Sequence, residues 1–90
     1  MNTYIVTVPH LRAVEVFEKD YFVKKAEREG YDDLQDFLDD QHTYHEVEGE
    51  QGLIELRNEY RTGHYSQHKL HEVIAAITEE LQHLGVEPRD

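Results

Sequence analysis

The sequence predicts an α+β fold, in which a small antiparallel sheet of two β-hairpins is packed by a long C-terminal helix and one or two short helices. Two observations lead to this fold class. Residues alternate between apolar and polar near the N-terminus and in the middle of the chain, as in strands, whereas apolar residues recur with a helical period in the C-terminal quarter. The 90 residues contain no cysteine and no internal repeat, so we expect a single domain over residues 1–90.

The first hairpin is expected from residue 3 to about residue 18. Tyr4, Val6 and Val8 alternate along its first strand, and Pro9 ends that strand because proline has no N–H to donate. Residues 13–17 alternate again and are rich in valine, which favours a second strand. A helix that begins near Leu11 is the alternative for this segment.

Two short helices are expected next. Asp20 can cap the first one, which ends at Gly30. Asp32 is the expected N-cap of the second, and Gln35 stands three residues later, where it completes a capping box. The apolar stripe of this second helix consists of Leu34, Phe37 and Leu38.

A second hairpin and a long helix complete the expected fold. Residues 43–50 alternate, residues 49–52 supply two glycines for a turn, and residues 53–60 resume an extended pattern. Ser66 is the expected N-cap of the last helix, and Gly85 and Pro88 follow its end. The apolar residues of this helix have helical spacing: Leu70, Val73, Ile74, Ile77, Leu81 and Leu84. The order of the strands does not follow from the sequence.

The charge of the chain is concentrated in residues 29–56, which we call the acidic segment. It contains ten of the 20 acidic residues and no lysine or arginine. Outside it ten acidic residues face nine basic ones, so almost the whole formal net charge of −11 belongs to this segment. Such a field attracts cationic partners and repels nucleic acids and anionic membranes. We therefore expect a basic protein as partner, and neither direct nucleic-acid binding nor membrane binding.

The acidic segment also has a pattern. The second short helix carries carboxylates over its whole outward face, although like charges four residues apart destabilise a helix slightly. In an extended conformation Glu46, Glu48 and Glu50 would lie on one side of a strand, about 6.8 Å apart. This spacing is similar to that of the backbone phosphates that a basic DNA-binding groove contacts. The candidate partner-binding residues are Asp32, Asp33, Asp36, Asp39, Asp40, Tyr44, Glu46, Glu48, Glu50 and Glu55.

The small size, the missing cysteine and the clustered acids, notably Asp32, Asp33, Asp36, Asp39, Asp40, Glu46, Glu48 and Glu50, resemble small bacteriophage host-takeover proteins of the DNA-mimic type. The resemblance is one of composition. It implies an inhibitor that occludes the DNA-binding surface of a basic host protein, such as a nucleoid protein of the HU kind, a nuclease or a polymerase. The expected location is the cytoplasm, of a bacterial host cell if the chain is phage-encoded, since no signal peptide or membrane-spanning run is present.

Three other interpretations stay open. The acidic segment can be a solvated face without a partner. The chain can be a small adaptor or dimerisation module that uses apolar and tyrosine side chains, with a homodimer burying part of the last helix. It can also be a metal-binding domain that uses histidine, with His64, His68 and His71 as candidate ligands, although no metal motif is present. No catalytic or cofactor signature occurs, so we expect neither enzyme activity nor a cofactor.

Histidines within the acidic segment suggest a pH dependence. His42 and His45 lie among carboxylates, which favour the charged imidazolium. Protonation at mildly acid pH would dilute the negative field and weaken binding to a basic partner.

Overall fold

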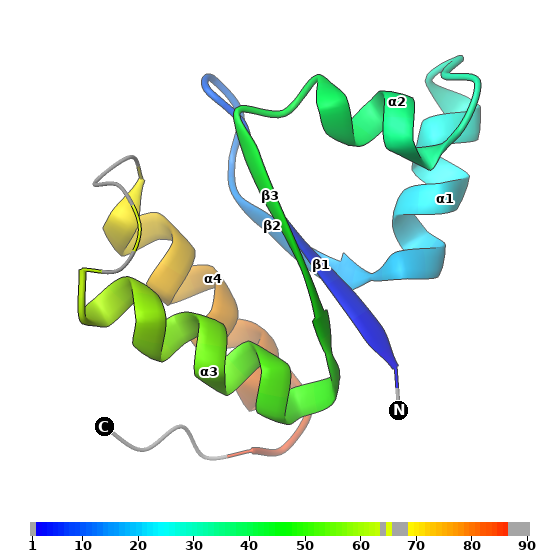
Figure 1. The fold of residues 1–90 in the computed structure, drawn as a ribbon. Coiled ribbons are helices and arrows are strands. Elements are labelled where there is room, and N and C mark those ends of the chain that lie inside the picture. The colour runs from blue at the N-terminus through cyan, green and yellow to red at the C-terminus, as the bar shows by residue number, and fades with distance from the viewer. Residues whose placement is uncertain (1, 64, 66–68, 87–90) are drawn as a thin grey trace.

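The computed structural model describes residues 2–63, 65 and 69–86. It confirms the α+β class and contains a three-stranded antiparallel sheet with the order β2-β1-β3. Helices lie on both faces of this sheet (Figure 1). The elements in chain order are β1 (Thr3–Val8), β2 (Glu15–Glu18), α1 (Lys19–Arg28), α2 (Leu34–Asp39), β3 (Thr43–Glu48), α3 (Gly49–Arg61) and α4 (Leu70–His83).

The predicted first hairpin is confirmed. Strands β1 and β2 pair antiparallel, with Tyr4 opposite Glu18 and Thr7 opposite Glu15. The helix considered from Leu11 is wrong, because residues 9–14 form the connection between the strands and Leu11 is 97% exposed there. Pairing with β1 holds residues 15–18 in the sheet, so only six residues remain to connect the two strands.

Strand β1 separates two cores. Its even-numbered residues Tyr4, Val6 and Val8 face α3 and α4, whereas Ile5 faces α1 and α2. The larger core contains Tyr4, Val6, Val8, Val16, Leu53, Leu56, Tyr60, Val73, Ile77 and Leu81. The smaller core contains Ile5, Phe22, Ala26, Phe37 and Leu38. Side chains that alternate along a strand thus fill a separate layer on each face of the sheet.

The predicted second hairpin is wrong. Residues 43–48 form β3, but this strand pairs with β1, and the residues that were expected to return as a strand form α3. Leu53, Leu56 and Tyr60 of α3 recur with helical spacing and belong to the larger core, and the buried Arg57 donates a hydrogen bond of 3.3 Å to the Thr78 hydroxyl of α4. Gly49 has a φ of 64° and turns the chain out of the strand directly into the helix. The two glycines therefore belong to a strand-to-helix junction instead of a hairpin turn.

Three predicted helix starts need correction. Helix α1 begins at Lys19, directly after β2, so Asp20 lies in its first turn and does not cap it. The N-cap of α2 is Asp33 and not Asp32, because the Asp33 Oδ1 atom accepts a hydrogen bond from the backbone N–H of Asp36 at 2.9 Å. The predicted cap Ser66 lies outside the described residues, and α4 begins after Lys69.

The predicted course of the last helix is otherwise confirmed. Its residues Val73, Ile77 and Leu81 are fully buried. The helix stops at His83, before Leu84, and Gly85 follows with a φ of 79°, which favours glycine.

Gly52 allows α3 to lie close to β3. A Cβ atom at residue 52 would lie 2.9 Å from the Cβ of Val47, too close for any side chain. We expect Gly52→Ala to lower the free energy of unfolding by up to about 2 kcal/mol, because an overpacking cost of roughly 1–3 kcal/mol offsets or exceeds a helix-propensity gain of about 1 kcal/mol. Urea denaturation measures the change.

Asn58→Ala is the control for this substitution, because Asn58 is exposed on the same helix. It should leave stability unchanged or raise it by a few tenths of a kcal/mol, on the order of the propensity difference. A Gly52→Ala protein that is more stable than the wild type by the full propensity gain of about 1 kcal/mol would show that α3 does not need its close approach to β3.

Candidate functional site

The structure divides the acidic segment into two surfaces. The first, the α2 surface, consists of exposed aspartates on and around this helix: Asp32, Asp33, Asp36, Asp39 and Asp40. No lysine or arginine of the described residues forms an ion pair with any of them. The pKa of Asp36 is raised, chiefly because the charge of Asp33 lies beside it and further because Asp36 is partly desolvated. Unrelieved repulsion of this kind favours the approach of a cation.

The expected row of three glutamates is wrong. Glu46 and Glu48 do lie in extended β3, on the face of the sheet that α1 and α2 cover, but Gly49 ends the strand and Glu50 lies in the first turn of α3. Glu46 forms an ion pair of 3.3 Å with Lys19, and Glu48 accepts a hydrogen bond of 3.1 Å from the Thr3 hydroxyl. The phosphate-like spacing is therefore limited to two carboxylates.

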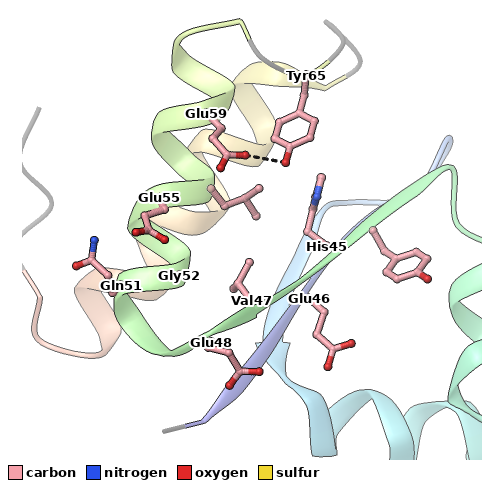
Figure 2. Close-up of a pocket in the computed structure, with 11 residues that line it drawn as sticks. His45, Glu46, Val47, Glu48, Gln51, Gly52, Glu55, Glu59 and Tyr65 are labelled. Atoms are coloured by element: carbon pink, nitrogen blue, oxygen red, sulfur yellow. Dashed lines mark hydrogen bonds between the residues drawn. The ribbon is translucent and has the colours of Figure 1, made fainter.

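The second surface is a groove of about 550 Å³ between β3 and α3, which we call the β3–α3 groove. Residues 44–48 form one wall, and one side of α3 together with Tyr65 forms the other. Its lining includes four glutamates: Glu55 and Glu59 from the helix, and Glu46 and Glu48 from the strand, whose side chains point away from α3 at the rim of the groove (Figure 2). The lining includes no lysine or arginine. Its volume is within the range of ligand-binding pockets.

The two surfaces meet at Tyr44. The Gln35 amide of α2 donates hydrogen bonds to the Tyr44 hydroxyl at 3.1 Å and to Asp39 at 2.8 Å. The Asp40 carboxylate, at the end of α2, accepts a hydrogen bond from Tyr31 at 2.6 Å. Tyr44, which lines the β3–α3 groove, is thus linked through Gln35 to the carboxylates of α2, so the two surfaces are adjacent.

The predicted site residues do not all belong to these surfaces. Tyr44, Glu46, Glu48 and Glu55 line the β3–α3 groove, and the five aspartates form the α2 surface. Glu50 lines a separate cavity of about 460 Å³ beside Asn2 and Ile54. The sequence prediction missed Glu59 and Tyr65. Glu59 follows Glu55 by one helical turn, so the correct helical assignment of α3 would have indicated it.

An aromatic cluster closes one end of the groove. The Tyr65 hydroxyl donates a hydrogen bond to Glu59 Oε2 at 2.7 Å, and this bond, with partial burial, raises the pKa of Tyr65 to about 12. The His45 Nε2 atom lies 2.6 Å from the Tyr60 hydroxyl oxygen, and the His45 ring packs against both tyrosine rings. These contacts fix the position of Glu59 at the rim of the groove.

The pKa of His45 does not shift in the expected direction, toward the charged imidazolium. Burial lowers the pKa of His45, and the nearby charge of Glu59 only partly opposes this effect. The neutral ring is therefore favoured, although the flanking residues in the sequence are acidic.

Among the candidate metal ligands, His71 is exposed on α4, and His64 and His68 lie outside the described residues. Within the described part of the chain no three histidine, aspartate or glutamate side chains are arranged to hold a metal ion. The described helices include none with the length and apolar character needed to cross a membrane. Comparison with protein-family models, curated proteins and solved structures finds no match for this chain.

His45 gives a testable pH dependence of stability. Its pKa in the folded protein lies below the unfolded value of about 6.5, so its stabilising contribution is complete above that pH and is lost as the pH falls toward the folded pKa. We expect the difference in unfolding free energy between the wild type and His45→Gln to become smaller from pH 7.5 to pH 5.5. Urea denaturation at both pH values measures it.

His71→Gln removes an imidazole from an exposed position and serves as the control. If the difference between wild type and His45→Gln stays constant or grows on acidification, the burial of a neutral His45 is contradicted.

Proposed function

We propose that this protein is a non-enzymatic acidic binding protein. It docks on the basic surface of a nucleic-acid-binding protein and blocks that surface, as a DNA mimic does. The observation that carries the proposal is the β3–α3 groove, whose lining has four carboxylates and no lysine or arginine. The proposed setting is the cytoplasm of a bacterial cell, with a nucleoid protein of the HU kind, a nuclease or a polymerase as partner.

The arrangement of the carboxylates supports a broad, cationic partner surface. Glu55 and Glu59 carry charge on the helix wall of the groove, Glu46 and Glu48 carry it along the strand on the other face of the sheet, and the α2 surface extends this charge past Tyr44. A single small cation would contact only part of it. Lysine and arginine side chains on a surface that normally binds phosphates would match the whole area, and their approach would relieve the repulsion around Asp36.

The apolar adaptor interpretation has less support. The only large hydrophobic side chains that are exposed among the described residues are Leu11 and Phe17. Phe17 is 38% exposed, and its ring stacks on Tyr21 with the centroids 4.1 Å apart. Two such residues do not form the wide apolar patch that an adaptor surface of this kind requires.

Neutralising the groove tests the proposal. The variant Glu46→Gln, Glu48→Gln, Glu55→Gln removes three charges from the groove and leaves Glu59 and its hydrogen bond in place. We expect it to bind the partner about tenfold more weakly at about 0.1 M salt, because each exposed charge pair contributes roughly 0.2–1 kcal/mol and three pairs at about 0.5 kcal/mol correspond to that factor. The partner is obtained by capture from nuclease-treated bacterial lysate, and its affinity is then measured by calorimetry.

The matched control is Asp20→Asn, Glu27→Gln, Glu79→Gln, which removes three exposed carboxylates from α1 and α4. It should keep wild-type affinity within about threefold, since general charge acts weakly beyond a Debye length of roughly 10 Å. The wild-type protein should also displace duplex DNA from the partner. Equal effects of the two triple variants, or a partner that keeps its DNA, would reject the proposal.

A further inference from the structure

The outer edge of β3 is open. In the register of β1 and β3, Asn2 lies opposite Gly49, and the Gly49 N–H donates a hydrogen bond of 2.7 Å to the Asn2 carbonyl. Hydrogen-bonded pairs alternate along an antiparallel ladder, so the backbone groups of His45 and Val47 point toward β1. Those of Tyr44, Glu46 and Glu48 point away from it. Among the backbone hydrogen bonds that the described residues form outside helices and strands, none reaches these three outward positions.

The opposite edge of the sheet is less suited to a partner. Strand β2 has four residues, and the same alternation gives it outward backbone groups only at Val16 and Glu18. The groove beside β2 has about 250 Å³, less than half the volume of the β3–α3 groove. Glu15 in that groove is already held by Lys25 at 2.9 Å.

Several features that protect an edge strand are missing from β3. Edge strands commonly carry charged side chains, especially lysine, or proline or a bulge that prevents pairing with another chain, and the charges of β3 are all negative, so they do not repel a cationic segment. The six residues of β3 include no lysine or proline, and they pair with β1 without an interruption in register. The edge also borders the β3–α3 groove along residues 44–48, which leaves space for an added strand.

We propose that an extended basic segment of the partner protein adds to β3 as a fourth strand and lies in the β3–α3 groove. This inference rests on the proposed function and names the binding mode and the recognised sequence pattern. The added strand takes its backbone hydrogen bonds from Tyr44, Glu46 and Glu48.

The recognised segment alternates basic and apolar residues. On one face of the sheet the added strand lies beside Glu46 and Glu48, and cross-strand neighbours of opposite charge stabilise the pairing. On the other face it lies beside Val47 and Leu56, which form the apolar part of the groove lining. Lysine or arginine on the first face and valine-like residues on the second match these two environments.

A second copy of this chain does not match this edge. Pairing of two β3 edges would bring Glu46 and Glu48 of both copies together, and like charges on neighbouring strands are destabilising. The formal net charge of −11 on each copy opposes the same contact. A cationic segment removes both difficulties.

The test uses the full chain and the peptide Lys-Val-Lys-Val-Lys, acetylated, amidated and fluorescently labelled, with binding measured by anisotropy. Two isomers carry two N-methyl groups each, either on the two valines or on two of the three lysines, and each isomer blocks one side of the peptide backbone. Strand addition predicts that one isomer binds at least about tenfold more weakly than the parent and the other binds nearly as well, since two lost hydrogen bonds exceed that factor.

Two substitutions of Glu46 distinguish the contribution of its charge from that of its backbone N–H. Glu46→Gln removes the charge alone, whereas Glu46→Pro also removes an outward N–H that β1 does not use, so the ladder to β1 is kept. Glu46→Pro should bind the parent peptide about fivefold more weakly than Glu46→Gln, because one hydrogen bond of about 1 kcal/mol is lost. Circular dichroism and thermal unfolding verify that both variants are folded, and the N-methyl isomers test the proposal independently of them.

Each other outcome is decisive. If both isomers bind like the parent and binding remains sensitive to salt, strand addition is overturned and acidic docking stands. If the parent peptide shows no salt-dependent binding, both proposals are rejected. A dimer of the free protein that Glu46→Pro dissociates would assign the edge to a second copy and overturn the peptide proposal.

Discussion

The burial of β1 on both faces is the constraint on which the rest of the structure depends. Ile5 and Val6 have no solvent exposure, and Val8 has 1%, so this strand contributes side chains to two cores at once. Both of its edges are paired, with β2 on one side and β3 on the other. Four helices then cover the two faces, and the outer edge of β3 remains as the longer open boundary of the sheet.

This arrangement places charge where it is least costly to the fold. The cores contain almost only apolar residues, and the carboxylates of the acidic segment lie on α2, at the edge of β3 and on the outer side of α3. Solvent screens such charges while the protein is free. A partner that excludes solvent from the β3–α3 groove would strengthen their attraction for its cations.

The sequence predicted the secondary structure correctly in segments whose apolar residues follow one clear period, either that of a strand or that of a helix. The alternation in β1 and the helical spacing in α4 each agree with their surroundings, so the hairpin and the last helix were predicted correctly. In residues 49–61 the local signals conflict, because two glycines indicate a turn although Leu53, Leu56 and Tyr60 have helical spacing. The function of Gly52 depends on its distance to Val47, which only the packed structure shows. The choice of Asp33 over Asp32 as N-cap depends likewise on the path of the chain into α2.

The sequence was enough to predict most of the charged residues of the candidate site, but it did not predict the groove that they line. Counting charges located Glu46, Glu48 and Glu55, but the groove that joins them forms only because α3 folds back along β3. Tyr65 enters the site after a loop, and the burial of His45 results from packing against Tyr60 and Tyr65, so neither has a local sequence signal. The α2 surface was predicted more closely, since one helix carries it.

The central claim is that the acidic edge of β3 is the docking surface, and amide hydrogen exchange tests it most directly. In the presence of the Lys-Val-Lys-Val-Lys peptide, exchange should slow at the outward N–H groups of Tyr44, Glu46 and Glu48. His45 and Val47, whose N–H groups bond to β1, should change little. Slowing that is confined to α2, or that is equal at all five residues, would contradict the account.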